Sequence, residues 1–518
     1  MKPRAADLLF AALLLAVVAA GLVGLDAVPR MHTDEPWQAA PGYELVTRGR
    51  FASQLFSGFH GMERHYYGFM PLSPILLGVS LRLFGLGLFQ MRLVPLALAS
   101  LVLLLTYLLG KRLFSPGRAL LAALVLASWP VAAPMAQLST GIPLADLARV
   151  ARYDIAVPVF GLLALLAVAR ASGEAPPPGS FALAGVLAGL AALSHVYGAF
   201  WLPALLLPFV ARTKDFFRRA LAALGGFCAT LAPWLLFVCT GFPDFLDQNR
   251  NYAERFALGH PAFFAHNLAH EIERYGFVAR GAREGALASW LFVAALVAGT
   301  AVLLRAREGA TRLLLGPAAV LVGLFALLLE QKNRMYLASL WPFLALVAAV
   351  ALGALLADRR PWVRIAAALL VAAATLEGAR RYADLFRRAR EATDYASLAA
   401  RVAAAVPRGA RLLAPSDYWT ILDGRVAAYR ALQVPIFLSQ ARYTPHPIPF
   451  AEAADRGAPD TLLLDESILH FLEEARAPAH PFAPLARAIE GYAGQGARIA
   501  AWEDPTYGRF AVYRLAAR

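Results

Sequence analysis

The feature that most constrains the fold is a series of apolar runs, each about 20 residues long, that recurs along most of the chain. As helices, runs of this length are long enough to cross ~30 Å of hydrocarbon. The composition agrees, because 59% of the residues are hydrophobic, 16% are charged and the mean hydropathy is +0.55. Soluble domains are more highly charged, at about 25% of residues. The chain is therefore predicted to be a polytopic α-helical membrane protein.

We predict about eleven spans, with the N-terminus inside and the C-terminus outside. They lie near residues 7–26, 91–110, 119–137, 154–169, 181–195, 197–211, 217–240, 286–304, 313–330, 335–356 and 362–379. The first run is interpreted as a retained span rather than a cleaved signal peptide, because no clear small-x-small cleavage site precedes HTDEPW (32–37). Basic residues gather in the short inside connections, which orients the chain and accounts for the net charge of +14 without nucleic acid.

The run at 71–89 is short, contains Arg82, and is broken by Pro71 and Pro74. It is therefore expected to form one or two helices at the outer membrane interface instead of a span. The outer face then carries four segments, which are the loops 27–90, 138–153 and 241–285 and a tail from about 380.

We expect two domains, a transmembrane domain over 1–380 that carries the site and a small soluble α/β domain over 381–518. The segment 393–407 has the pattern of an amphipathic helix, and RLLAPS (411–416) and TLLLDES (461–467) have that of short strands. RIAAWED (498–504) and RFAVYRL (509–515), joined by a PTYG turn, predict a terminal hairpin.

Two acidic positions at the outer face indicate a site. Asp34 and Glu35 directly follow the first span, where partial desolvation suits a general base, although Thr33 or Asp34 could equally serve as a helix N-cap. Asp154 follows Arg152 at the outer entrance of a later span, where an ion pair or another N-cap is the alternative. Because the predicted topology puts both positions on one face, we expect them to share a site.

Cations and aromatic residues near the same face are candidates for binding a phosphate and a sugar. In FHGMERHYYGF (59–69) these are Arg64, His65, Tyr66 and Tyr67, for which an interfacial aromatic belt is the alternative. In EQKNRMYL (330–337) they are Lys332, Arg334 and Tyr336, and the two cations could instead extend to lipid headgroups.

Three histidines are weaker candidates. His195 lies at a predicted outer hairpin tip, where packing is the alternative to substrate contact. His266 and His270 are four residues apart, a spacing that metal ligands use on a helix, but HExxH is absent. Walker, Rossmann, Gly-x-Ser-x-Gly and Cys-x-x-Cys motifs are absent as well.

Taken in order, these motifs resemble the GT-C class of lipid-linked-sugar glycosyltransferases over about residues 1–380. More narrowly, Asp34-Glu35, Asp154 in ARYDIA and RMYLASLWPFLALVAA (334–349) resemble the protein O-mannosyltransferase and aminoarabinose transferase group. Two departures stand out, because Met70 lies at or near the position of a phosphate-contacting lysine, and Ser194-His195 replaces a Thr-Lys pair. No Trp-Trp-Asp motif is present, which argues against an oligosaccharyltransferase.

The resemblance implies an inverting glycosyltransferase that uses a polyprenyl-phosphate sugar at the outer face of a bacterial-type inner membrane. Asp34 would be the base, and Glu35 or Asp154 would hold the acceptor, a cation or Arg152. The implied residues are Lys332, Arg334, Arg255, Arg64 and His65 for the donor phosphate, and Arg152, Tyr66, Tyr67, His195 and Tyr336 for the substrate.

The implied partners are the lipid-linked donor, membrane lipid and an acceptor protein, lipid or glycan. A divalent cation, Mg or Mn, is not firmly indicated. Two alternatives stay open, a lipid or solute transporter and an assembly factor whose tail binds cell-wall partners. A transporter would carry charges in mid-span and repeated halves, which the sequence does not show.

Overall fold

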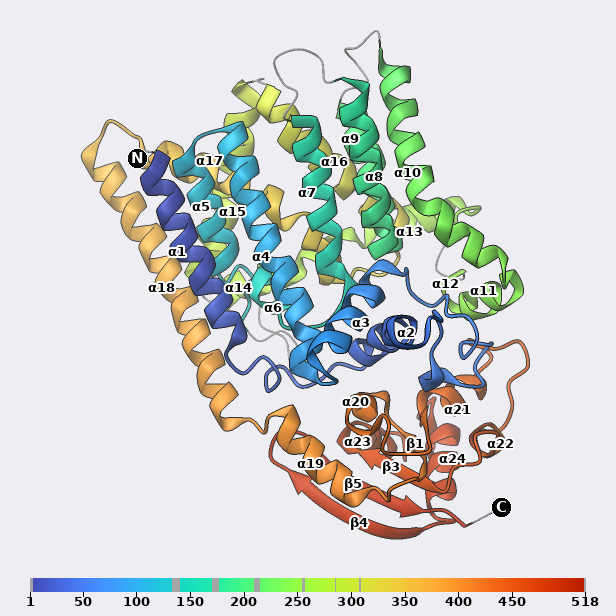
Figure 1. Cartoon of the computed structure of the whole chain (residues 1–518). Helices are drawn as coiled ribbons and strands as arrows, with labels where there is room; N and C mark the ends of the chain where they lie inside the picture. The colour runs from blue at the N-terminus through green and yellow to red at the C-terminus, as the bar shows by residue number, and fades with distance from the viewer. Residues whose placement is uncertain are drawn as a thin grey trace.

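The protein is a bundle of apolar helices with a separate α/β domain against one end (Figure 1). The computed structural model describes residues 3–132, 140–169, 177–208, 215–253, 257–284, 286–306 and 309–516. The bundle helices are α1 (Pro3–Leu22), α4 (Leu88–Leu113), α5 (Pro116–Ser128), α7 (Ala156–Ala169), α8 (Pro178–Ser194), α9 (Trp201–Leu206), α10 (Phe216–Cys239), α15 (Leu287–Ala306), α16 (Gly309–Leu328), α17 (Trp341–Leu356) and α18 (Pro361–Glu391).

Each predicted span overlaps one of these helices. By length and composition, six segments of the described chain can cross a membrane: α1, α4, α10, α15, α16 and the segment that begins with α18. The other bundle helices are apolar but shorter. The protein is thus a multi-pass membrane protein, while its span count and orientation stay predictions.

The predicted span 119–137 is too long, because helix α5 ends at Ser128. Pro130 is the cause, since a proline disfavours helical geometry in the residue before it, and Trp129 is extended with φ −90° and ψ 123°. The rest of that prediction, 133–139, lies outside the described residues.

Small residues bring the bundle helices together. A Cβ on Gly185 of α8 would lie 1.9 Å from the carbonyl oxygen of Ala223 in α10, and one on Gly226 of α10 would lie 2.3 Å from the carbonyl oxygen of Ala182. In a membrane, lipid tails are as apolar as the helices, so the hydrophobic effect does not drive helices together. Helices associate there through close backbone packing of this kind.

Two helices, α2 (Asp34–Arg48) and α3 (Leu72–Phe84), lie across the end of the bundle, between it and the C-terminal domain (Figure 1). They cross at glycines, because a Cβ on Gly42 would lie 1.7 Å from the carbonyl oxygen of Pro74. Helix α3 ends at Phe84 and α4 begins at Leu88, so most of the run 71–89 forms a helix of its own, and its place at the membrane interface stays a prediction.

Short elements connect these helices. They are η1 (Gln54–Phe56), α6 (Pro143–Leu147), η2 (Tyr153–Ile155), η3 (Val196–Phe200), α11 (Phe242–Gln248), α12 (Arg250–Ala253), α13 (Pro261–Ala269), η5 (Glu271–Tyr275), α14 (Gly276–Arg283) and η6 (Arg334–Ser339).

The C-terminal domain is a mixed sheet covered by helices, with strand order β2-β1-β3-β5-β4. Its strands are β1 (Arg411–Ala414), β2 (Ala428–Ala431), β3 (Thr461–Asp465), β4 (Ala497–Asp504) and β5 (Gly508–Arg514). Its helices are α19 (Tyr395–Ala405), η7 (Ser416–Tyr418), α20 (Trp419–Leu422), α21 (Gln433–Leu438), α22 (Phe450–Asp455), α23 (Glu466–Glu474) and α24 (Ala483–Ala493). The predicted helix, both strands and the hairpin are confirmed, whereas β2 was not predicted.

The boundary near 380 falls inside a helix, because α18 continues unbroken to Glu391. Beyond it, the domain docks on the loop that follows α2. Arg430 Nε donates to the carbonyl oxygen of Ser57 at 2.9 Å, and His60 Nε2 lies 2.8 Å from the carbonyl oxygen of Tyr443. One apolar core runs across this junction, since it contains Phe56 and Phe59 of the loop together with domain residues such as Leu412.

Candidate active site

The first turn of α2 carries both residues of the predicted acidic pair. Thr33 occupies the N-cap position but makes no side-chain capping bond, and Asp34 and Glu35 begin the helix. Helix capping therefore does not use the Asp34 carboxylate, and the two neighbouring carboxylates point to different surroundings.

Glu35 is fully buried in an ion pair with Arg92 of α4. Arg92 Nε and Nη2 each donate to one Glu35 oxygen at 2.8 Å. The backbone N–H groups of Ala151 and His32 donate to the same carboxylate at 2.8 and 2.7 Å. Burial alone would raise the pKa of Glu35, but Arg92 and these donors hold it below its ordinary value. Glu35 therefore connects the start of α2 to α4, through Arg92, and to the segment that carries Arg152, through the backbone of Ala151.

Asp34, Arg152 and Asp154 form the predicted cluster. Arg152 Nη1 donates to Asp34 Oδ2, and Arg152 Nε donates to Asp154 Oδ2 at 2.9 Å. The Asp34 side chain is 28% exposed, whereas that of Asp154 is 2% exposed. Asp34 is therefore the accessible carboxylate, and Asp154 fixes Arg152 from behind.

A cavity of about 470 Å³ opens in front of Asp34. We call it the Asp34 cavity, and it is lined by Asp34, Trp37, Tyr67, Gly68, Phe69, Met70, Arg152, Tyr153, His195, Val196, Tyr197, Trp234, Phe245, Asn249, Tyr252, Gln331, Asn333 and Tyr336. Of the predicted site residues, it brings together Asp34, Arg152, Tyr67, His195 and Tyr336.

Stacked rings form one wall of the Asp34 cavity. The rings of Tyr153 and His195 stack at 4.2 Å between centroids, and Tyr197 meets Tyr336 edge to face at 4.8 Å. His195 Nδ1 also accepts the backbone N–H of Tyr197 at 3.2 Å. His195 is thus packed and also lines the cavity, while its contact with substrate stays a prediction.

Only some residues of the segment 331–336 line the Asp34 cavity. Gln331 and Asn333 line it, whereas Lys332 turns away and donates to Glu271 Oε2 at 3.0 Å and to the carbonyl oxygen of Leu329 at 2.8 Å. Successive residues of a non-helical segment face opposite sides, which sequence proximity alone does not show. The structure therefore holds Lys332 in an ion pair away from Asp34.

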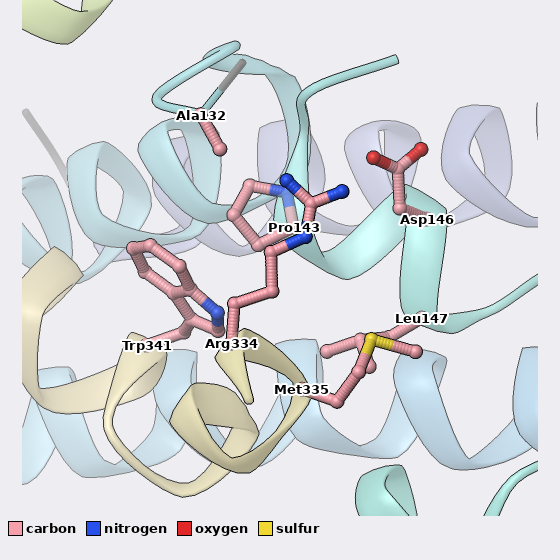
Figure 2. Close-up of a pocket in the computed structure, with 7 residues that line it drawn as sticks. All are labelled: Ala132, Pro143, Asp146, Leu147, Arg334, Met335 and Trp341. Atoms are coloured by element: carbon pink, nitrogen blue, oxygen red, sulfur yellow. The ribbon is translucent and has the colours of Figure 1, made fainter. Parts of the chain in front are cut away.

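Arg334 faces a different, small cavity of about 30 Å³. Figure 2 shows its guanidinium beside Pro143, on the side of Asp146, with Trp341 and Met335 at its base. Burial raises the pKa of Asp146 and lowers that of Arg334, and their opposite charges counter both effects. The structure does not bring Arg334 to the Asp34 cavity.

Of the predicted site residues in the loop 59–69, some line the Asp34 cavity and others do not. Tyr67 lines the Asp34 cavity, but Tyr66 is buried against Phe51 and Phe69. Arg64 is exposed and pairs with Asp244 at 3.2 Å, and the ring of His65 packs on Phe237. Arg255 lies outside the described residues.

His266 and His270 lie on α13 and at its C-terminus. Their ring centroids are 4.1 Å apart, and His270 Nδ1 lies 2.9 Å from the carbonyl oxygen of His266. Among the residues that the structure describes, no three His, Cys, Asp or Glu side chains are grouped to hold a metal ion.

Sequence reasoning missed several neutral wall residues and two buried arginines. The amides of Asn249, Gln331 and Asn333 have no motif that marks them. Arg92 did carry a recognisable pattern, because an arginine inside an apolar span usually has a buried partner. Arg149 donates to the carbonyl oxygens of Val28, Gly21, Val23 and Gly24, which fixes the exit of α1.

The sequence model of the family described as dolichyl-phosphate-mannose-protein mannosyltransferase matches residues 70–237. No curated protein sequence matches the chain. ArnT from Cupriavidus metallidurans matches in its apo state with a TM-score of 0.62 and 16% identity, over 100% of this chain and 99% of that chain. Its structure bound to undecaprenyl phosphate gives the same TM-score and identity over 99% and 98%.

The archaeal oligosaccharyltransferase AglB from Archaeoglobus fulgidus, in complex with an inhibitory peptide and a dolichol-phosphate, matches with a TM-score of 0.52 and 16% identity. That match covers 98% of this chain and 74% of the other. These matches show that the chain has a GT-C-like fold, as predicted. Within that class, the chain resembles the protein O-mannosyltransferases and ArnT, and this resemblance is confirmed.

Proposed function

We propose that the protein is an inverting glycosyltransferase that moves a sugar from a polyprenyl-phosphate donor to an acceptor hydroxyl at the outer face of a bacterial-type inner membrane. The observation that carries the proposal is Asp34, a partly exposed carboxylate at an aromatic cavity of about 470 Å³. The matching structures with undecaprenyl phosphate and dolichol-phosphate support a lipid-phosphate donor.

In the proposed reaction, Asp34 accepts the proton of the acceptor hydroxyl as that oxygen attacks the anomeric carbon. The bond between the anomeric carbon and the phosphate oxygen breaks, and polyprenyl phosphate leaves with the electron pair. Arg152 fixes the orientation of Asp34, and Asp154 fixes Arg152. Glu35 takes no part in proton transfer, because its carboxylate is fully buried and committed to Arg92.

The donor's phosphate would lie near Arg152. Among the described residues that line the Asp34 cavity, Arg152 is the one with a permanently positive side chain. Developing negative charge on a leaving phosphate is stabilised by positioned cations and N–H donors. The side chains of Gln331 and Asn333 supply neutral donors in the same wall. Arg255, three residues after the wall residue Tyr252, remains a further candidate from the sequence.

The donor's sugar would lie against the rings of Tyr153, Tyr197 and Tyr336. Tyrosine supplies an apolar face for a sugar ring together with a polar hydroxyl at its edge. The isoprenoid chain would lie between apolar bundle helices, which offer lipid-like surfaces.

The test is transfer of labelled sugar from a panel of polyprenyl-phosphate donors, in membranes that hold the full-length protein and native acceptors. Removal of a general base lowers rates by about 10²- to 10⁴-fold, so Asp34→Asn should lose transfer to that extent at unchanged protein level. The control is Asp358→Asn, an isosteric change in the loop between α17 and α18.

Two results would contradict the proposal in different ways. Robust transfer by Asp34→Asn would exclude Asp34 as the base and turn attention to Asp154. Transfer by the wild type from no donor in the panel would argue against the function itself.

A further inference from the structure

A second cavity, of about 290 Å³, lies where the chain after α1 meets the C-terminal domain. We call it the junction cavity, and it is lined by Pro29, Arg30, Met31, His32, Thr33, Tyr395, Asp417, Tyr418, Asp465, Ser467 and Tyr507. None of these residues lines the Asp34 cavity. The volume is close to the lower end of ligand pockets, roughly 300 Å³.

The wall of the junction cavity is in direct contact with Asp34. His32 Nδ1 accepts the backbone N–H of Asp34 at 3.1 Å and lies 3.7 Å from Asp34 Oδ2. Because Nδ1 is an acceptor here, the neutral ring carries its proton on Nε2. His32 therefore lies between a group bound in the junction cavity and the proposed base.

A second connection runs through the C-terminal domain. Trp37, in the wall of the Asp34 cavity, donates its indole N–H to Ser416 Oγ at 3.0 Å. Ser416 Oγ donates in turn to Asp417 Oδ1 at 3.3 Å. One hydrogen-bonded chain thus links the walls of the two cavities.

Asp417 lines this cavity and, within the described chain, has no charged partner. Asp465 is committed, since it accepts from Tyr418 Oη at 2.9 Å and Ser467 Oγ at 2.7 Å. No Lys or Arg of the described chain forms an ion pair with Asp417. Burial and the nearby Asp465 raise the pKa of Asp417 to about 8, so its carboxyl is largely protonated at neutral pH. It can then both donate and accept hydrogen bonds.

The rest of the cavity wall also combines hydrogen-bond donors with hydrogen-bond acceptors. Arg30 and His32 supply N–H donors, Thr33 and Ser467 supply hydroxyls, and tyrosines supply ring faces. The hydroxyl of Tyr507 is buried and has no hydrogen-bond partner in the described part of the chain. An ammonium group would meet the Arg30 guanidinium, and a phosphate would meet the Asp465 carboxylate. A neutral ring that bears several hydroxyls matches donors and acceptors alike.

From this geometry we propose that the junction cavity binds a neutral sugar unit of the acceptor, with Asp417 as its anchoring group and His32 as the wall shared with Asp34. The inference rests on the proposed function and adds to it that the acceptor is a glycan or glycolipid. The donor's sugar belongs in the Asp34 cavity, because the donor's lipid must stay among the bundle helices.

The test is chemical labelling of Asp417 in the purified full-length protein. A water-soluble carbodiimide with glycine ethyl ester converts accessible carboxyls to amides, which peptide mass spectrometry quantifies at each site. The probes are methyl β-glucoside and methyl α-mannoside, and N-acetylthreonine amide represents a peptide acceptor. We expect both glycosides to lower labelling of Asp417 severalfold, while labelling of Asp423 in the same domain stays unchanged.

Three results would overturn the inference. The first is protection of Asp417 by N-acetylthreonine amide or by undecaprenyl phosphate but not by the glycosides. The second is labelling that no probe changes. The third is failure of Asp417 to react while Asp423 does, because a cavity closed to the reagent is closed to a sugar. The assay needs no turnover, so protection without transfer from any donor would count against the proposed function and leave the sugar site in place.

Discussion

Asp34 and Glu35 are adjacent in the chain, yet the structure gives them opposite surroundings. The Asp34 side chain is 28% exposed at a cavity, whereas that of Glu35 is 0% exposed against Arg92. Adjacent residues in the first turn of a helix point about 100° apart, so only one of them can face the cavity while the other faces α4. The acidic pair therefore combines one accessible carboxylate with one that fixes the position of the first.

Removal of the buried charge on Glu35 should destabilise the protein. We expect Glu35→Gln to lower the free energy of unfolding by about 3–5 kcal/mol, because it leaves Arg92 charged and unpaired in the interior. Thermal unfolding of the protein in detergent measures this effect. Glu452→Gln is the control, since its pair with Arg456 is exposed on both sides and should matter little. A Glu35→Gln variant as stable as the wild type would show that Arg92 does not depend on this charge.

Asp417 predicts a pH dependence with a definite sign. Its pKa is raised to about 8 in the folded protein, above the ordinary value of 3.8. Between these values the unfolded chain holds fewer protons than the folded one, so stability falls as the pH rises, by up to about 1.4 kcal/mol per pH unit. Below pH 4 this stabilisation is fully present, and above pH 8 it is lost.

Melting temperatures of wild type and Asp417→Asn across pH 4–8 check this expectation, since asparagine cannot titrate. As the pH rises, the melting temperature of the variant should increase steadily relative to that of the wild type. Parallel curves would show that Asp417 is ionised throughout.

At the scale of elements, the crossing of α2 and α3 holds in place the helix that begins with Asp34. Gly42 and Gly78 meet at this crossing, where a Cβ on Gly78 would lie 2.2 Å from the carbonyl carbon of Gly42. Backbone cannot move aside as a flexible side chain does. Any side chain at the crossing must therefore push the two helices apart.

Gly42→Ala should consequently lower both stability and transfer, the former by about 1–3 kcal/mol as expected for overpacking. Gly225→Ala in α10 is the matched control, because a Cβ there meets no atom within 4 Å. Parallel thermal unfolding and transfer assays distinguish the two variants. Equal behaviour of both would show that α2 and α3 can separate without cost.

The sequence predicted elements whose patterns are local, and missed features that depend on side-chain direction. The helices, the terminal hairpin, and the meeting of Asp34 with Arg152 and Asp154 follow from apolar periodicity and from topology. The directions of Lys332 and Arg334 do not, because Lys332 lies in an irregular segment and Arg334 begins the short helix η6, and neither carries a periodic pattern that shows where a side chain points. The β2 strand was missed because AYRA is too short to show a pattern.

At the scale of the whole molecule, the C-terminal domain supports the site by holding the loop that carries Tyr67. Arg430 of β2 donates to the carbonyl oxygen of Ser57 and to those of Ala453 and Ala454 in its own domain. It therefore fixes the loop to the sheet with a single side chain.

Arg430→Met should free the loop and leave the carbonyl oxygens of Ser57 and Ala453 without their Arg430 donor, at about 1–3 kcal/mol for each group. We expect faster proteolysis within 50–67 and weaker transfer. Arg498→Met, at an exposed position of β4, is the control. A loop as protected in Arg430→Met as in the wild type would assign the docking to the apolar core alone.

Helix α18 has a consequence for the reach of the enzyme. Its 31 residues span ~46 Å, about 16 Å more than the hydrocarbon layer. A Cβ on Gly378 would lie 1.6 Å from the carbonyl oxygen of Ser128, so the helix cannot slide along α5. The position of α18 along its own axis is thus fixed relative to the bundle. If the proposed function holds, α18 sets the height of the C-terminal domain above the bilayer and, with it, how far an acceptor must project from the membrane to be reached.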